Sequence, residues 1–153
     1  MLNSTEDAVS RWGPAVYRMA YAMVRSRHDA DDVFQEVFLR LHRSVPRFES
    51  EEHRKAWLLR VTVNCSRSLL ASPWRRRTES LEDVYAYQDP EESSLSEAMA
   101  KLVPKYRAVI HLYYYEGYTT GEIAALLGRK PSTVRAQLTR AREKLAGLLK
   151  EDL

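Results

Sequence analysis

The chain has few of the residues that support metal binding, redox chemistry or covalent crosslinking. Its 153 residues include one cysteine, Cys65, so an internal disulfide bond is impossible. Its four histidines show no spacing typical of a zinc site. No arrangement of residues indicates a catalytic site. We therefore expect a protein that is not an enzyme and that holds no metal or other cofactor.

Long apolar runs and glycine are also scarce. No apolar run approaches the length that crosses a bilayer, which predicts no membrane insertion. The N-terminus begins acidic and lacks the basic start and apolar stretch of a signal peptide, so we expect a cytoplasmic protein. The chain has only five glycines, and long stretches of it follow helical spacing.

Apolar residues at this spacing predict an all-α protein. The predicted helices are residues 6–26, 29–44, 54–71, 93–102, 104–116, 119–127 and 131–150. The first three helices can close a small bundle. We predict two small helical domains, an N-terminal helical bundle at residues 1–72 and a C-terminal helix-turn-helix domain at 93–153, joined by a flexible acidic linker at 73–92. A linker of this length spans at most about 65–70 Å.

The net charge of +3 hides an uneven distribution of charge. Residues 53–77 carry seven Arg or Lys and no acid, residues 79–97 carry seven acids and no Arg or Lys, and residues 129–150 carry seven Arg or Lys against Glu143 alone. Two basic blocks separated by an acidic one indicate two separate contacts with a polyanion. The alternative is that these runs are solvated helix faces.

The segment from Gly121 to Leu145 is typical of a helix-turn-helix, whose second helix enters the major groove of DNA. An apolar stripe that includes Val134 and Leu138 faces the domain, and basic residues lie away from it. Arg135 is the first candidate for a base contact and Arg140 the second, because arginine can bind guanine O6 and N7 together. The remaining candidates for this surface are Ser132, Thr133, Thr139, Arg142 and Lys144.

Two alternatives apply to this domain. Arg140 and Arg142 could pair with Glu143 or Glu122 in place of DNA. The tyrosines at 113–115 and 118 could form a platform for base stacking, but their helical spacing favours partly buried packing.

A second basic edge lies on the predicted helix 54–71. Trp57, Arg60, Asn64 and Arg67 follow one another at spacings of 3, 4 and 3, which places them on one edge. An aromatic ring with cations and an amide suits single-stranded DNA, where rings stack on bases and cations follow the backbone. The arginines at 75–77 would extend this track. The alternative has Trp57 as a core anchor and the arginines as solvated residues.

The helix 29–44 opens with four acids and no base. Acids near a helix N-terminus are favourable through the helix dipole alone. An acidic face repels nucleic acid, however, so in a DNA-binding protein it indicates a basic protein partner. The candidate residues on this face are Asp29, Asp32 and Glu36.

These segments together resemble the extracytoplasmic-function (ECF) bacterial sigma factors, promoter-specificity subunits of RNA polymerase in the sigma-70 family. Residues 29–41 resemble the segment that binds the clamp helices of the β′ subunit. Arg47 and Phe48, with residues 55–64, resemble the segment that melts and reads the −10 element. Residues 102–117 and the helix-turn-helix resemble the domain that reads the −35 element. The resemblance covers nearly the whole chain.

The resemblance implies that the chain binds core RNA polymerase, at the β′ clamp helices and the β flap, and promoter DNA at two elements. The residues that dock on polymerase would be Asp29, Asp32, Gln35 and Glu36. The loop 48–54 would hold a base flipped out of the non-template strand. The −10 contacts would be Phe48, Arg54, Trp57, Arg60, Asn64 and Arg67, although Arg54 stands where many relatives carry an aromatic residue. An anti-sigma factor is a further expected partner.

Two other functions compete with this interpretation. A helix-turn-helix regulator that acts without polymerase would leave the acidic residues at 29–36 and the Trp57 edge unexplained. A sigma-like interaction protein would bind polymerase or a regulator but not DNA.

Overall fold

The computed structural model describes residues 4–72 and 94–151, and the secondary structure within those ranges is entirely helical. The N-terminal half consists of α1 (Thr5–Val24), α2 (Arg27–Ser44) and α3 (Glu51–Ala71). The C-terminal half consists of α5 (Ser94–Lys101), α6 (Pro104–Ile110), the π-helix η1 (His111–Tyr115), α7 (Thr120–Leu127) and α8 (Pro131–Glu151). The predicted all-α class is confirmed, and the predicted linker at 73–92 lies outside the described residues.

Serine residues set the starts of the three N-terminal helices. Ser4, Ser26 and Ser50 are N-caps, and each side chain accepts a hydrogen bond from a backbone N–H three residues later. Because Ser50 caps α3, this helix begins three residues earlier than the prediction at residue 54. Glu51 and Glu52 then occupy its first turn, where the helix dipole favours acids.

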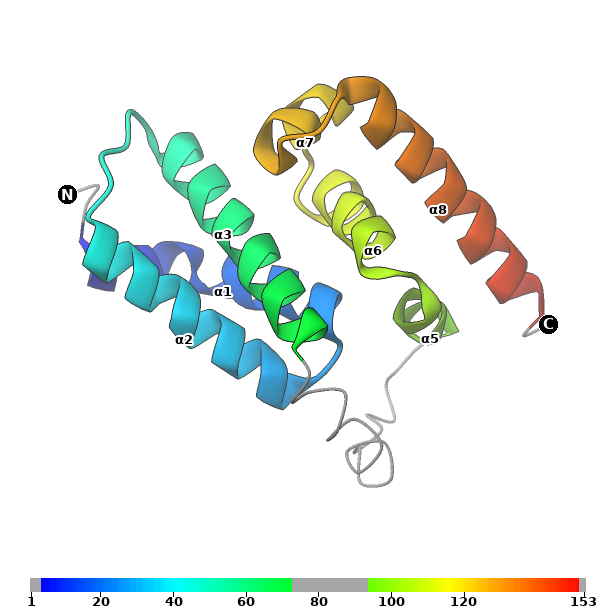
Figure 1. The fold of residues 1–153 in the computed structure, drawn as a ribbon, viewed down its shortest axis with the longest axis horizontal. Coiled ribbons are helices and arrows are strands. Elements are labelled where there is room, and N and C mark those ends of the chain that lie inside the picture. Colours follow the sequence, from blue (N-terminus) through cyan, green and yellow to red (C-terminus); the bar gives the residue numbers. More distant parts are fainter. Residues whose placement is uncertain (1–3, 73–93, 152–153) are drawn as a thin grey trace.

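The first three helices form a bundle in which each helix packs against the other two (Figure 1). Its core includes Val16, Met19, Val37, Leu58 and Val63, whose side chains are at most 1% exposed. Apolar stripes at helical spacing close on one another in this way because none of the helices can bury its stripe alone. Within the described residues, no helix combines the length and the apolar character that spanning a lipid bilayer requires.

Arg54 lies fully inside this bundle, with 0% exposure. Its Nη2 lies 2.7 Å from the Asp7 carboxylate and 2.9 Å from the Glu51 carboxylate. Trp12 Nε1 also donates to Glu51, at 2.8 Å. The hydrogen bond from Arg54 holds the pKa of Asp7 below its usual value. Arg54 therefore joins the start of α3 to the start of α1.

A π-helical turn shapes the C-terminal half. The residues at 104–116, predicted as one helix, form α6 and then η1, where the backbone N–H of Glu116 donates to the carbonyl of His111. A bond between residues five apart is the mark of a π turn, which widens the helix and turns the residues that follow. Gly117 follows at φ 75°, a left-handed conformation that glycine adopts readily.

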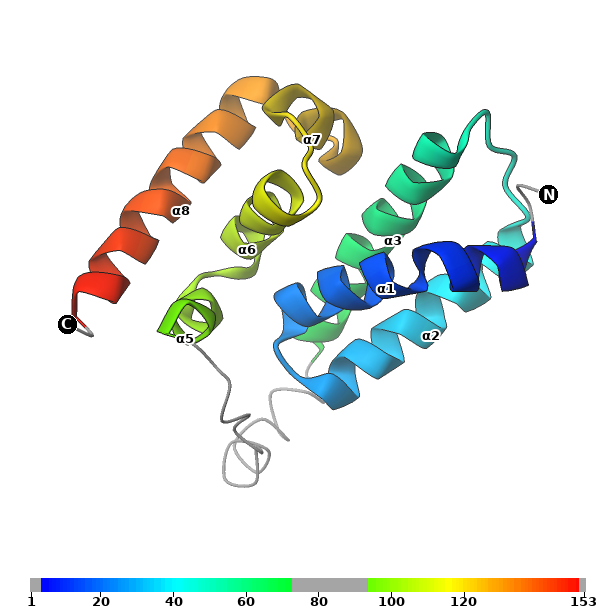
Figure 2. The same ribbon diagram turned by 180° about the vertical axis from the view of Figure 1, so that it is seen from behind.

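The two halves contact each other along α1, which lies beside α6 and η1 (Figure 2). Arg107 of α6 is buried, and its Nε donates to the carbonyl of Met23 in α1 at 3.1 Å. Arg25, which follows α1, donates to the carbonyl of Ser96 in α5 at 3.0 Å. Each bond satisfies a backbone carbonyl of one half with a side chain of the other.

Glu116 carries the densest charge contact between the halves. Its side chain is 2% exposed, and its carboxylate lies 3.1 Å from Lys55 Nζ and 3.5 Å from Arg18 Nη2, both in the N-terminal half. His111 Nε2 lies 3.3 Å from the same carboxylate. Burial opposes ionisation, but the hydrogen bonds and charges of His111 and Lys55 outweigh it and lower the pKa of Glu116 to about 2.

We predict that replacing Arg54 with Ala lowers the free energy of unfolding by about 3 kcal/mol, because it removes a buried cation from two carboxylates. Urea unfolding measures the change. Arg60, on the same helix but exposed, is the control, and Arg60→Ala is expected to stay within about 0.5 kcal/mol of the wild type. Equal midpoints for the two variants would contradict the role of Arg54.

We also predict an acid-sensitive contribution from Glu116. Its pKa is lowered from 4.5 to about 2, so its stabilisation is complete above about pH 4.5 and is lost as the pH falls through about 2. The free energy of unfolding of the wild type should decrease across this interval by up to about 3 kcal/mol more than that of Glu116→Gln. Urea unfolding at pH 6, 4, 3 and 2 tests this, and parallel curves for the two proteins would refute it.

Candidate nucleic-acid interface

The helix α8 buries one face and exposes the other. Val134, Leu138 and Ala141 are 0–3% exposed and pack beneath the helix. The candidate DNA contacts of this helix are all exposed, namely Ser132, Thr133, Arg135, Thr139, Arg140, Arg142 and Lys144. Hydroxyl groups at the start of the helix and cations along it are the groups that bind phosphates and base edges in a major groove.

The turn before α8 is held by local hydrogen bonds. Thr119 and Glu122 form a capping box at the start of α7. Gly128 ends α7 at φ 67°, the left-handed conformation expected for the turn glycine. Arg129 donates to the side-chain carbonyl of Gln137 at 2.7 Å, which ties the turn to α8. The helix-turn-helix is thus a fixed unit, with α7 and α8 in contact.

Arg142 has an aromatic partner. Its Nε donates to the Tyr114 hydroxyl at 2.6 Å, and its guanidinium lies 5.3 Å from the Tyr113 ring and 5.5 Å from the Tyr114 ring. The hydrogen bond to Tyr114 raises the pKa of Arg142. The structure therefore gives Arg142 two tyrosines in place of the glutamates considered above.

The tyrosines divide into two groups. Tyr113 and Tyr118 are half-buried, as expected from their spacing. Tyr114 and Tyr115 are instead 56% and 65% exposed, because the π turn rotates them away from the core. The expectation of partly buried packing is therefore wrong for this pair.

The residues predicted to form a basic edge on α3 do lie along one side of that helix. Arg60, Asn64 and Arg67 are exposed, and Trp57 is half-buried. The Trp57 ring packs at 5.7 Å against Phe48, which is buried in the loop that joins α2 to α3. Phe48 thus supports Trp57 from below, while the polar residues along the edge face solvent. Residues 75–77 lie outside the described part of the chain.

Three candidate residues occupy interior positions. Phe48, expected at the −10 surface, is 9% exposed because it packs under Trp57 in the loop before α3. Arg54, expected at the −10 surface, has no exposed side-chain surface because it pairs with Asp7 and Glu51. Asp29, expected at the polymerase surface, is only 7% exposed because it lies in the first turn of α2 against the bundle. We therefore correct all three assignments, and none of these side chains is offered for binding in this structure.

The rest of the acidic surface is open. Asp32 and Gln35 are exposed and Glu36 is half-buried. Glu36 accepts from Arg40 Nε at 3.0 Å, one helical turn away. Asp32 lies 3.7 Å from His28, which carries charge only when protonated. These local pairs are solvated and therefore weak, so the side chains stay available to a binding partner.

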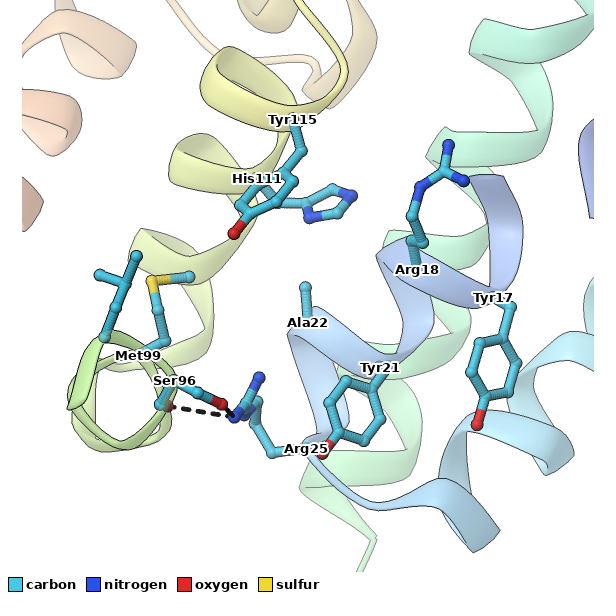
Figure 3. Close-up of a pocket in the computed structure, with 10 residues that line it drawn as sticks. Tyr17, Arg18, Tyr21, Ala22, Arg25, Ser96, Met99, His111 and Tyr115 are labelled. Carbon is cyan, nitrogen blue, oxygen red and sulfur yellow. Dashed lines mark hydrogen bonds between the residues drawn. The ribbon is translucent and has the colours of Figure 1, made fainter. Parts of the chain in front are cut away.

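A cavity of about 270 Å³ lies between the halves. Figure 3 shows Tyr17, Arg18 and Tyr21 of α1 on one side, and Met99 of α5 with His111 and Tyr115 of η1 on the other. Arg25 bonds to Ser96 at its lower edge. The sequence did not predict this junction or the contacts of Glu116. The residues that meet there are up to 98 positions apart along the chain, as Arg18 and Glu116 are, and share no motif.

Comparison with known proteins assigns both halves. Residues 8–77 match the family description "Sigma-70 region 2", and residues 92–145 match "Sigma-70, region 4". The chain is 33% identical to the ECF RNA polymerase sigma factor SigE of Mycolicibacterium smegmatis, covering 95% of this chain and 62% of that protein. It is 31% identical to the ECF RNA polymerase sigma factor SigM of Mycobacterium tuberculosis, covering 88% of this chain and 71% of that protein.

A solved structure shares the fold. The sigma factor RpoE from Bartonella quintana, in complex with the anti-sigma factor NepR, superposes with a TM-score of 0.71 over 97% of this chain and 98% of that chain. The identity between the two is 22%. The all-helical arrangement of both halves therefore occurs in a protein of quite different sequence.

Proposed function

The chain belongs to the extracytoplasmic-function sigma factors of the sigma-70 family, and from this premise we propose that it binds core RNA polymerase and directs transcription initiation at promoters with −10 and −35 elements. The observation that carries the proposal is the order of its surfaces. An acidic surface on α2 and a basic edge on α3 belong to the region 2 match, and the basic face of α8 belongs to the region 4 match.

The −35 element is assigned to α8. Arg135 and Arg140 are the base-reading residues, since both are exposed and neither has an ion pair among the described residues. Ser132 and Thr133, at the helix start, bind a phosphate, and Thr139, Arg142 and Lys144 complete the contact. Arg142 reaches the backbone from a position held by Tyr114.

The −10 element is assigned to α3. Trp57 offers a ring on which an unstacked base can stack, and Arg60, Asn64 and Arg67 follow the strand. Phe48 acts by supporting Trp57, at a ring distance of 5.7 Å. Flipping a base out of the stack costs a few kcal/mol, and contacts along this edge must recover that free energy.

Polymerase binding is assigned to Asp32, Gln35 and Glu36 on α2, and their partner is the β′ clamp helices. The β flap is the partner of the C-terminal half. The domain limits that we propose are residues 1–72 and 93–153, with 73–92 as the connecting linker. The role is regulatory and requires no catalysis by this chain. Because it acts with polymerase, we place it in the cytoplasm, and an anti-sigma factor is the expected inhibitor.

The first test concerns DNA reading. We predict that Arg135→Ala with Arg140→Ala lowers promoter-specific transcription by core polymerase at least about tenfold, since each arginine–guanine pair contributes about 1–3 kcal/mol. In vitro transcription on a randomised promoter library measures the effect. The control, Lys101→Ala with Lys150→Ala, removes the same charge from other exposed positions. Full activity of the arginine variant would favour a sigma-like interaction protein.

The second test concerns polymerase binding. We predict that Asp32→Lys with Glu36→Lys abolishes assembly with core polymerase, because it places cations against a basic partner surface. Co-sedimentation of the purified chain with core enzyme measures assembly. The control, Glu6→Lys with Glu97→Lys, makes the same change in net charge at other exposed acids. Unchanged assembly of the α2 variant would favour a regulator that acts without polymerase.

A further inference from the structure

We propose that Glu116 is an intramolecular latch that holds the two halves in a closed form unable to engage a whole promoter. The proposal rests on the function assigned above and adds a means of regulation. The carboxylate belongs to the C-terminal half, and two of its cations, Lys55 and Arg18, belong to the N-terminal half. Separation of the halves therefore strips Glu116 of both partners.

The burial of Glu116 makes this contact decisive. Its side chain is 2% exposed in the closed form. A buried carboxylate is costly unless it is paired and hydrogen-bonded, and here Lys55 Nζ at 3.1 Å and His111 Nε2 at 3.3 Å supply the pairing. Lys55 is itself enclosed, since its amine lies 5.4 Å from the Trp12 ring and 5.6 Å from the Tyr118 ring. These rings come from both halves, so Lys55 is held in place only when the halves meet.

The remainder of the junction has two unfavourable features. The cavity of about 270 Å³ beside the latch leaves the apolar surfaces of α1, α5 and η1 incompletely packed (Figure 3). On the opposite side, α3 contacts α7, and burial with the nearby charge of Arg67 lowers the pKa of Arg129. Two like charges thus approach each other where α3 meets the helix-turn-helix. Buried apolar residues of both halves belong to one core, and Glu116 adds the most strongly charged contact to the polar bonds that join the halves.

Geometry shows why the closed form must open. The labels −10 and −35 place the two elements about 25 base pairs apart, which is about 85 Å of duplex at 3.4 Å per base pair. In the closed form α3 touches α7, and α7 touches α8. Each of α3 and α8 has 21 residues, which is about 30 Å of helix. The two reading surfaces are therefore too close together to occupy both elements at once.

The latch also gives DNA a way to compete with closure. A phosphate offers Lys55 and Arg18 the same kind of charge-assisted acceptor as a carboxylate. Lys55 lies on α3, two residues before Trp57, and is thus close in sequence to the residues assigned to the −10 strand. Glu116 accordingly takes the place of a phosphate until the halves separate.

The test measures the separation of the halves in the full-length chain. Spin labels are attached to Ser68→Cys on α3 and Gly147→Cys on α8, two exposed positions, in a Cys65→Ala background. A Cβ at Gly147 meets no atom within 4 Å, so this label site is free of steric conflict. Pulsed dipolar spectroscopy then reports the closed fraction of the doubly labelled parent protein and of its Glu116→Gln variant, without DNA or polymerase.

We expect a short, narrow distance in the parent protein and at least about a tenfold loss of the closed population relative to the open one in Glu116→Gln. Lys55→Met should shift the distribution in the same direction, and the two changes together should be less than additive. The control is Glu97→Gln, which alters the charge equally at an exposed position of the same half and should leave the distances unchanged. Overlapping distributions for the parent and Glu116→Gln, or an open parent protein, would overturn the latch.

A second measurement links the latch to promoter binding. Glu116→Gln should bind a promoter fragment with an unpaired −10 region more tightly than Glu97→Gln does, because less of the protein is closed. Equal affinities would overturn the inhibitory role. If the distances respond but no variant binds promoter DNA or core polymerase, the failure lies in the proposed function and removes the inhibitory role with it.

Discussion

A buried carboxylate links the two helical halves of the molecule. Glu116 is enclosed at the point where the π turn of η1 meets α1 and α3, with Arg18 at 3.5 Å, and its pKa is lowered to about 2 by His111 and Lys55 against the opposing effect of burial. An unpaired charge at that depth would be strongly unfavourable, so the position of each half depends on the other. One of its partners, Lys55, lies on α3, the helix that carries the basic edge.

Arginine has two distinct uses in the chain. Arg54 and Arg107 are buried and act as internal ties, one to carboxylates of α1 and α3 and the other to the carbonyl of Met23. Arg60, Arg67 and Arg135 are exposed and have their donors available to a polyanion. A planar guanidinium with five donors suits both uses, because it can satisfy several acceptors at once wherever it lies. Burial decides between them.

The sequence alone determined much of the fold. Apolar spacing placed the helices of the described residues to within a few positions, because each helix of a small bundle must carry a continuous apolar stripe. Gly128 and Pro131 marked the turn of the helix-turn-helix through local backbone preferences that need no tertiary contact. The exposed face of α8 is the side opposite its apolar stripe. The edge at Arg60, Asn64 and Arg67 followed from the helical spacing of these residues on α3.

Only the tertiary structure decided which charged residues are interior and how the halves meet. Arginine and aspartate usually lie at the surface. Arg54 is buried because it pairs with Asp7 and Glu51, and Asp29 because of the packing of α2, and no local sequence pattern contains either cause. The π turn that exposes Tyr114 and Tyr115 has no sequence signature of its own. The cluster around Glu116 joins residues that are up to 98 positions apart. Periodicity reports on neighbours within a helix, whereas a charge contact between helices exists only once the chain has folded.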